Sequence, residues 1–370
     1  MRIGVPREIK DGEFRVGMTP EGVRSLHALG HELLVQSRAG ERVGFTDADY
    51  AAAGAQIADD AARVYDSDLV VKVKELYPAE FALLHPGLIV FCFHHLAPDP
   101  AMMQALIDAR ITAIAFETVG AGDGSLPILK PMSEIAGRLS LPVAMWALQM
   151  KNGGSGTLLT GVDGVAPGKV VILGAGASGA NAAHVAVGLG CRTVVFARGQ
   201  KRLDALQARY PGQLQTRLSS PEAIGQEIAD ADVVIGAVLT PGQVSPTLIT
   251  REMLRGMKRG AVLIDIGIDQ KGIAETSRPT SHSDPIFVEE GVVHYCVPNM
   301  PAAVARTATI ALAAASLPHV QALATHGLKG AAQRDARLAE GIQLHLGAVT
   351  YLHLARDTGR PYTPLIEALR

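Results

Sequence analysis

The stretch KVVILGAGASGANAA, residues 169–183, decides the fold of this chain. Four apolar residues follow Lys169, then come Gly174, Gly176 and Gly179, and an apolar-faced helical pattern begins at once. The first glycine permits a tight turn, the second lets a pyrophosphate approach the backbone, and the third lets the helix pack closely on the strand. The free N–H groups at the start of that helix then favour phosphate. The stretch therefore predicts a strand–turn–helix unit that binds a dinucleotide, with a merely tight turn as the alternative.

Outward from this turn, short apolar runs alternate with helical patterns twice along the chain, which is typical of parallel sheets covered by helices. The predicted strands of the first series lie at 1–6, 31–36, 69–74, 88–93 and 111–116. In the second series, one predicted strand lies at the start of the stretch 169–190, and the others lie at 193–197, 232–238, 261–267 and 292–297. Helical patterns cover 20–30, 131–150 and most of the tail from about 303, and a glycine-rich link covers 152–168. The pattern predicts an α/β protein with two Rossmann-like, doubly wound domains.

Length, composition and charge narrow the function classes. The chain has 370 residues, of which 48% are hydrophobic and 19% charged, and its formal net charge is -2. This length suits two domains of ordinary size, and the composition argues against disorder. The near-neutral charge gives no electrostatic footprint for nucleic acid or for an anionic membrane. We therefore expect small-molecule partners, no nucleic acid and no membrane.

The cysteines and the apolar stretches point to a reducing compartment. Cys92, Cys191 and Cys296 stand far apart in apolar runs, which gives neither a metal-type spacing nor a disulfide framework. We expect buried thiols, no bound metal and a cytoplasmic location. The start MRIGVPREIK has no apolar signal core. The most apolar helical stretch, 309–323, is too short to span a bilayer, so we expect a buried helix there.

Several other stretches are far more specific than the glycine turn. They include MRIGVPREIKDGEFRVGMTPEGV, LVVKVKE, FCFHHL, PMSEIAGRL, ADVVIGAVLTPG, GAVLIDIGIDQKG, RPTSHSDPIF and YCVPNMPAAVARTAT. Over nearly its whole length the chain resembles the alanine dehydrogenase/transhydrogenase α-subunit family. The resemblance implies two domains with the active site in the cleft between them. It assigns residues 1–130 plus 303–370 to the substrate and catalytic domain and 131–302 to the dinucleotide-binding Rossmann domain. It also implies a homo-oligomer, commonly a hexamer.

The resemblance also implies a reaction, the reversible oxidative deamination of L-alanine to pyruvate and ammonia with a nicotinamide as hydride acceptor. Arg15 in EFRVGMTP would clamp the substrate carboxylate, which a planar guanidinium binds bidentately. Lys74 in KVKE would stabilise negative charge on the carboxylate or carbonyl oxygen. His95, the second histidine of FHHL, would be an acid/base near that oxygen, and Asp269 in IGIDQ is the other candidate acid/base.

Taken without the resemblance, these four residues have simpler interpretations. Lys74 would be a solvated rim residue, Arg15 a surface ion-pair partner, His95 a strand-end histidine and Asp269 a cap. Asp232 and Asp265 also look like strand-end caps. His94 points away from His95 by strand alternation and has a structural interpretation. The resemblance places four further residues near the cofactor: Ser133, Asn299 and Met300 near the nicotinamide, and Leu239 near the adenosine half.

The second strand of the dinucleotide fold lacks its usual acidic end. In family members that use NAD, this strand ends in an Asp that binds the adenosine ribose. In TVVFARGQKRL the aligned position is Ala197, followed by Arg198, Lys201 and Arg202. The charge that would repel a 2′-phosphate is absent, and cations that can bind that phosphate stand next to it. We therefore predict NADP in preference to NAD, with use of both cofactors or a solvated helix turn as alternatives.

Other departures from the family pattern concern the link and the substrate. Ser155 stands where the family usually has Arg, Asp163 where it has Pro, and Ala305 where Pro precedes Arg306. They put the hinge geometry and the assembly contacts in doubt. The substrate could be another small 2-amino or 2-oxo acid, handled mainly in the reductive direction. Two other functions stay open, a transhydrogenase-like soluble subunit and a non-catalytic nucleotide-binding sensor.

Overall fold

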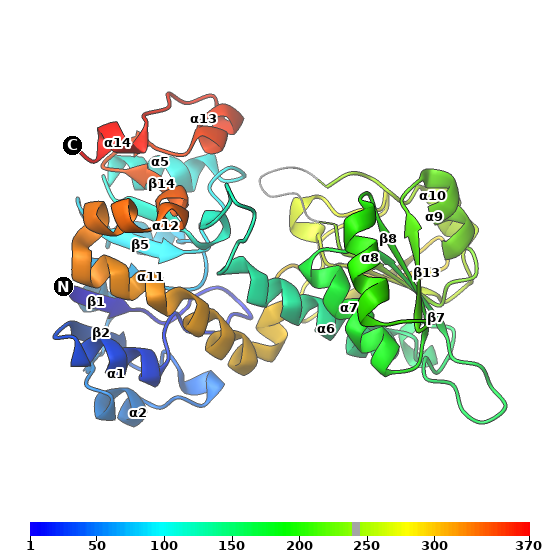
Figure 1. Ribbon diagram of the computed structural model, residues 1–370. Helices are drawn as coiled ribbons and strands as arrows, with labels where there is room; N and C mark the ends of the chain where they lie inside the picture. Colours follow the sequence, from blue (N-terminus) through cyan, green and yellow to red (C-terminus); the bar gives the residue numbers. More distant parts are fainter. Residues whose placement is uncertain (239–244) are drawn as a thin grey trace. The chain divides into compact units, whose positions relative to one another are not determined.

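The chain divides into two compact units, which we describe separately. The structure, a computed structural model, describes residues 1–238 and 245–370. Unit 1 comprises residues 1–132 and 304–370, and unit 2 comprises 133–303. Figure 1 shows unit 1 in the colours of the two ends of the chain, blue to cyan and orange to red, and unit 2 mainly in green and yellow.

Unit 1 is built on an eight-stranded sheet in the order β15-β14-β6-β5-β4-β1-β2-β3. Neighbours from β6 to β3 run parallel, whereas β14 pairs antiparallel with both β6 and β15. The strands are β1 (Arg2–Val5), β2 (Glu32–Gln36), β3 (Gln56–Ala58), β4 (Leu69–Val71), β5 (Ile89–Cys92), β6 (Thr112–Ala115), β14 (Ile342–His345) and β15 (Ala348–Val349). The strand order reverses between β1 and β4. From that point β1, β2 and β3 follow one another in one direction, and β4, β5 and β6 follow one another in the other.

Helices cover the unit 1 sheet. They are α1 (Pro20–Ala28), α2 (Asp47–Ala52), α3 (Ala61–Tyr65), α4 (Pro78–Phe81), α5 (Pro100–Asp108), α11 (Ala305–Arg334), α12 (Ala336–Gly341), α13 (Leu352–Thr358) and α14 (Leu365–Ala368), with short 3-10 turns η1 (Glu41–Val43) and η2 (Phe116–Thr118). Helix α1 begins where expected because the Thr19 side chain accepts a hydrogen bond from Gly22 N–H and Pro20 occupies the first turn.

The apolar stretch expected as a buried helix lies in α11. Among the described residues, one helical segment, 300–334, is long and apolar enough to cross a membrane by length and composition. Its buried residues include Thr309 and Leu312, and the Thr309 hydroxyl accepts a hydrogen bond from Val16 N–H. Helix α11 also contacts α1. These contacts are those of a core helix of unit 1, which agrees with the prediction.

Unit 2 has a seven-stranded sheet in the order β12-β13-β11-β10-β7-β8-β9. All neighbours are parallel except β12 and β13. The strands are β7 (Lys169–Leu173), β8 (Arg192–Ala197), β9 (Leu214–Leu218), β10 (Val233–Gly236), β11 (Val262–Asp265), β12 (Ile286–Glu289) and β13 (Val292–Tyr295). Its helices are α7 (Ala177–Gly188), α8 (Gln200–Arg209), α9 (Pro221–Ile228) and α10 (Arg251–Arg255), with 3-10 turns η3 (Met150–Asn152) and η4 (Ile268–Gln270).

The chain passes between the units twice. Helix α6 (Leu129–Ala147) carries it from unit 1 into unit 2, and the 3-10 turn η5 (Met300–Val304) carries it back. In α6 the backbone at Gly137 approaches the Ser178 carbonyl so closely that a Cβ would overlap that oxygen. A glycine is therefore needed where α6 meets the start of α7 within unit 2.

Every strand that the sequence predicted is present in one of the two Rossmann-like sheets. Sequence reasoning missed β3, β9, β12, β14 and β15. The prediction of a mostly helical tail is right for α11 to α14 but wrong for β14 and β15, which extend the sheet antiparallel beyond β6. Strand β9 escapes notice because its sequence LQTRL is polar and mostly exposed, and β3 has only three residues.

Candidate active site

The sequence-predicted residues of unit 1 follow the carboxyl ends of neighbouring parallel strands. Arg15 lies in the loop after β1, Lys74 follows β4, and His95 follows β5. Strands β1, β4 and β5 are adjacent in the sheet, and the order reverses between the first two. Ligands of open α/β sheets bind outside the carboxyl ends of the strands at such a reversal. The topology therefore brings these three residues to one edge of one sheet.

The Arg15 guanidinium is buried, with 2% of the residue exposed. Glu13 binds it bidentately, because Nε donates to Oε1 at 2.7 Å and Nη2 donates to Oε2 at 2.6 Å. The Arg15 N–H also donates to Glu13 Oε1, at 3.0 Å. Arg15 Nη1 lies 3.3 Å from the sulfur of Met132, which is a weak acceptor. Glu13 therefore fixes the plane of the guanidinium, and its Nη1 also contacts the Met132 thioether.

Lys74 is held from its backbone and from its side chain. Its N–H points at Glu8 Oε1 at 3.4 Å, and its Nζ lies 3.2 Å from Glu75 Oε2. Glu75 also accepts a hydrogen bond from Lys10 Nζ, at 2.7 Å. Although burial alone would raise the pKa of Glu75, Lys74 and Lys10 hold that pKa well below its usual range. A permanent carboxylate thus anchors the Lys74 ammonium.

His95 has the exposure of a residue that meets a ligand. Its side chain is 44% exposed, its backbone is left-handed with φ 48, and its ring stacks on Phe93 at 6.0 Å. A left-handed φ is strained for a histidine and marks a constrained position. Glu117 stabilises it, because Oε1 accepts the His95 N–H at 2.7 Å and lies 3.9 Å from Nδ1. The other Glu117 oxygen accepts the His94 N–H at 3.3 Å.

The neighbouring His94 turns into the core, as strand alternation predicts. It is fully buried, and its Nε2 is 3.0 Å from the Val90 carbonyl oxygen. Burial lowers the pKa of His94, so this ring is neutral near pH 7. A buried neutral imidazole tied to a strand carbonyl is a structural element.

Sequence reasoning missed four residues around this edge: Glu8, Glu13, Glu117 and Met132. Glu117 follows β6, the next parallel strand, so the rule that strand ends share an edge could have found it. Glu8 and Glu13 lie in the loop between β1 and α1, where any acidic residue looks like solvated surface. Met132 contacts Arg15 across 117 sequence positions, and nothing in its local pattern indicates that contact.

In unit 2 the glycine turn lies at the corresponding reversal of strand order, between β7 and β10. Gly174 has φ 116, and a Cβ there would overlap the Ala237 carbonyl oxygen. A Cβ at Gly179 would overlap the carbonyl oxygen of Gly174. At Gly176 the nearest neighbour of a Cβ would be Arg202 Nη1, 3.9 Å away. Two glycines are thus required by packing, and the middle one leaves open space at the start of α7 that suits a pyrophosphate.

Three cations surround the end of β8, next to this turn. Ala197 ends the strand with 7% exposure, whereas Arg198, Lys201 and Arg202 are exposed. Within the described ranges, no carboxylate forms an ion pair with any of these three. Lys201 and Arg202 occupy the first turn of α8, where the helix dipole disfavours positive charge. An anion bound there would relieve this unfavourable arrangement.

The remaining sequence-predicted residues of unit 2 have varied environments. Asp269 is exposed on η4, just after β11. Ser133 and Asn299 are half-buried, Asn299 with a left-handed φ of 59, and Met300 is buried. Leu239 lies outside the described residues.

Asp232 and Asp265 are caps, as predicted from their places beside strands. Asp232 accepts the Lys169 N–H at 2.8 Å and binds Lys258 Nζ at 2.9 Å. Asp265 accepts hydrogen bonds from Ile273 N–H and Ser277 Oγ. Both carboxylates therefore stabilise loops of unit 2.

The three cysteines are buried, and the described part of the chain contains no cluster of side chains that could hold a metal ion. Cys92, Cys191 and Cys296 are buried and free, and burial raises the pKa of each thiol. Such thiols are poorly reactive. Across residues 1–238 and 245–370, no group of three His, Cys, Asp or Glu side chains is arranged to hold a metal ion.

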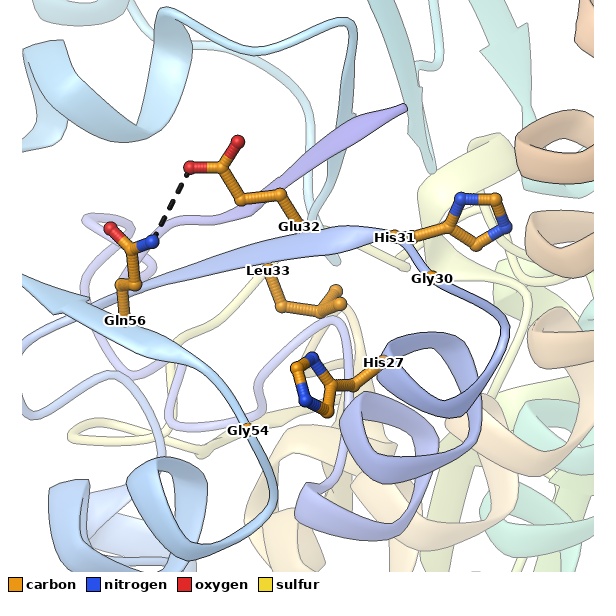
Figure 2. A pocket seen from close by; sticks show the side chains of 7 residues that line it. All are labelled: His27, Gly30, His31, Glu32, Leu33, Gly54 and Gln56. Atoms are coloured by element: carbon orange, nitrogen blue, oxygen red, sulfur yellow. Dashed lines mark hydrogen bonds between the residues drawn. The ribbon is translucent and has the colours of Figure 1, made fainter.

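None of the sequence-predicted site residues lines the pocket of unit 1 that Figure 2 shows. It is lined by His27, Gly30, His31, Glu32, Leu33, Gly54 and Gln56. Glu32 and Gln56 are the first residues of β2 and β3, so this pocket opens at the amino ends of the strands. The only side-chain contact drawn in it is a 3.5 Å hydrogen bond from Gln56 to Glu32. None of the described residues that line it carries a guanidinium or ammonium group that could bind a carboxylate.

Comparison with known proteins finds similarity over nearly the whole chain. The family description "Alanine dehydrogenase/PNT, N-terminal domain" matches residues 4–136, and "Alanine dehydrogenase/PNT, C-terminal domain" matches residues 141–352. The alanine dehydrogenases of Halomonas elongata and Mycobacterium tuberculosis are each 46% identical to the chain. Each match covers 98% of this chain and 98% of the relative.

Solved structures give the same result. A structure titled L-alanine dehydrogenase superposes with a TM-score of 0.94 at 43% identity, covering 97% of this chain and 99% of that one. A transhydrogenase from Sinorhizobium meliloti has a TM-score of 0.78 at 22% identity, over 95% of this chain and 99% of that one. The second likeness concerns the fold alone.

Proposed function

The chain belongs to the alanine dehydrogenase/PNT family, and we propose that it catalyses the reversible oxidative deamination of L-alanine to pyruvate and ammonia with NADP as the preferred cofactor. Unit 1 is the substrate domain and unit 2 the dinucleotide domain in this proposal. The observation that carries it is the shared sheet edge of Arg15, Lys74 and His95 in unit 1. The family resemblance further supports a homohexamer that works in the cytoplasm.

Arg15 and Lys74 bind and orient the substrate. Glu13 holds the Arg15 guanidinium in one plane, so a substrate carboxylate that binds this guanidinium is held in one orientation. Lys74, anchored by Glu75, supplies a second positive charge. It stabilises the negative charge that develops on the carbonyl oxygen when ammonia adds to pyruvate, and on the same oxygen when ammonia leaves in the reverse direction. The two cations together select a small acid with oxygen or nitrogen on the second carbon.

His95 and Asp269 handle protons. Bound nicotinamide supplies hydride chemistry, and the glycine turn of unit 2 fits the pyrophosphate of such a cofactor. The His95 ring is exposed and fixed by Phe93 and Glu117, so it can take the proton of the attacking water and return one to the departing amine. The Asp269 carboxylate is the second acid/base.

The choice of NADP rests on the end of β8. A 2′-phosphate carries nearly two negative charges and three acceptor oxygens. Arg198, Lys201 and Arg202 are exposed around the strand end, and Ala197 brings no repelling charge. These residues supply both an attraction for NADP and the absence of a repulsion.

An Arg202→Ala variant tests this choice by binding alone. We expect its Kd for NADPH to rise about tenfold or more, since a charge-assisted hydrogen bond contributes about 1.5–3 kcal/mol. Its Kd for NADH should change much less. The measurement is titration of cofactor fluorescence without substrate. Arg209→Ala, at the other end of α8, is the matched control and should bind both cofactors normally. Equal weakening of NADH and NADPH would contradict a 2′-phosphate site.

The two competing functions make different predictions. A non-catalytic sensor would bind NADPH but would not oxidise it with pyruvate and ammonium. A transhydrogenase-like subunit would transfer hydride between nucleotides and need no Arg15 and Lys74 pair. The arrangement of these two cations around the unit 1 sheet edge favours the dehydrogenase.

A further inference from the structure

A buried carboxyl group, Glu8, lies beneath the proposed substrate-binding residues of unit 1. It follows β1, at the point where the strand order reverses, and only 8% of it is exposed. Its Oε1 accepts the Val73 N–H at 2.6 Å and faces the Lys74 N–H at 3.4 Å. Within the described chain, its buried Oε2 has no hydrogen-bond partner. It lies 3.7 Å from Lys72 Nζ. Oε1 thus fixes the turn that carries Lys74. For Oε2, the loss of hydration on burial is only weakly offset by Lys72.

The surroundings of Glu8 oppose its ionisation. Burial raises its pKa, attraction by Lys72 and the hydrogen bond from Val73 lower it, and the like charges of Glu13 and Glu80 raise it again. The net result is a pKa of about 7. Glu8 interacts electrostatically with five titratable groups: Lys72, Glu13, Glu80, Tyr65 and Cys92. Of these, Lys72 is the cation.

Lys72 compensates the charge of Glu8 only in part, because it also binds Glu80. It is fully buried, and its Nζ donates to both oxygens of Glu80, at 2.9 and 3.0 Å, and to the Glu75 carbonyl at 3.2 Å. Glu80 is in turn satisfied by the Tyr65 hydroxyl and the Tyr77 N–H. Two buried acids therefore share one lysine, and the acid with the poorer contacts is Glu8.

We propose that Glu8 is a positioning residue for the substrate carboxylate and takes up a proton when that carboxylate binds beside Arg15 and Lys74. The inference rests on the proposed function. Ionised Glu8 and a bound carboxylate repel each other across a poorly hydrated region, because Glu8 contacts the Lys74 backbone and interacts with Glu13, the partner of Arg15. Binding of the anion therefore favours neutral Glu8, and by linkage a neutral Glu8 favours binding. The proton comes from the solvent.

The test is calorimetry of pyruvate binding to the enzyme saturated with NADP+, in two buffers of different ionisation enthalpy near pH 7. Pyruvate and NADP+ are both oxidised, so no hydride transfer can follow. We expect the wild-type protein to take up a fraction of one proton per pyruvate. Glu8→Gln should still bind pyruvate but without this uptake, since the amide cannot titrate.

Two further variants separate Glu8 from its neighbours. Glu80→Gln removes the acid that competes with Glu8 for Lys72, which should lower the pKa of Glu8 and so reduce the uptake near pH 7. His95→Gln removes the imidazole proposed near the substrate but leaves Glu8 and Lys72 unchanged, so the uptake should persist. Both measurements, together with that on the wild type, decide the question even if Glu8→Gln fails to fold.

A kinetic readout distinguishes positioning from a purely structural role. In the wild type, the KM for pyruvate should rise as the pH increases from about 6 to about 8, because Glu8 ionises over this window. Glu8→Gln should flatten this rise and change kcat less than KM. Pyruvate binding without proton uptake, or an uptake that survives in Glu8→Gln, would overturn this inference and leave the proposed function intact. Absence of both pyruvate binding and turnover in the wild type would overturn the proposed function and, with it, the inference.

Discussion

An Ala197→Asp variant is expected to prefer NADH, in contrast to the preference for NADPH proposed for the unaltered chain. The new carboxylate stands at the end of β8, where it can accept hydrogen bonds from the adenosine ribose and repel a 2′-phosphate. Charge-assisted hydrogen bonds contribute about 1.5–3 kcal/mol each, so the ratio of kcat/KM for NADPH over NADH should fall by about a hundredfold or more. Steady-state kinetics with both cofactors measure this ratio.

Ala197→Asn is the control for this substitution. It has nearly the same size as the aspartate and can accept a ribose hydrogen bond, but it carries no charge. If repulsion of the phosphate matters, the asparagine variant should show a much smaller change in the NADPH to NADH ratio. Equal changes in the two variants would mean that bulk at a position only 7% exposed explains the effect, and the electrostatic account would be wrong.

The second large effect is expected from His95→Gln, which should lower kcat for pyruvate amination by about a hundredfold to ten-thousandfold, the usual contribution of general acid–base catalysis. Glutamine keeps a polar side chain of similar reach but cannot transfer a proton near pH 7. Stopped-flow and steady-state assays at saturating pyruvate, ammonium and NADPH measure the loss.

The position of His95 supplies its own control. His95 belongs to unit 1, whereas the glycine turn and the cations around Ala197 belong to unit 2. NADPH binding should therefore be unchanged in His95→Gln. Glu117→Ala, which removes the acceptor of the His95 N–H, should lower kcat by a smaller factor because the ring itself remains. A full kcat in His95→Gln would remove this residue from the proposed chemistry.

The sequence predicted the fold well because its strongest signals are local. An apolar strand, three spaced glycines and a helix make one continuous unit in 169–183, and the structure shows that packing requires a glycine at Gly174 and Gly179. The other parallel strands are apolar runs of similar kind. The missed strands are short, polar or antiparallel at a sheet edge, as β9 and β14 are, and their pairing depends on neighbours far away in the chain.

The candidate site was predictable only in part. Arg15, Lys74 and His95 were named through family resemblance, because single charged residues at strand ends more often have structural roles. Sequence spacing alone does not reveal that the ends of β1, β4 and β5 share one sheet edge, which follows from strand order. Glu8 was missed for the same reason, since its contacts with the turn after β4 cross 65 sequence positions.

The most direct test of the central claim is the rate at which the purified protein oxidises NADPH and NADH, measured in parallel with pyruvate and ammonium at saturation. The account predicts turnover with both substrates present, none when ammonium is omitted, and a kcat/KM for NADPH well above that for NADH. A higher kcat/KM for NADH would contradict the role assigned to Arg198, Lys201 and Arg202. Tight NADPH binding with no oxidation of either cofactor would contradict alanine and pyruvate as the substrate pair.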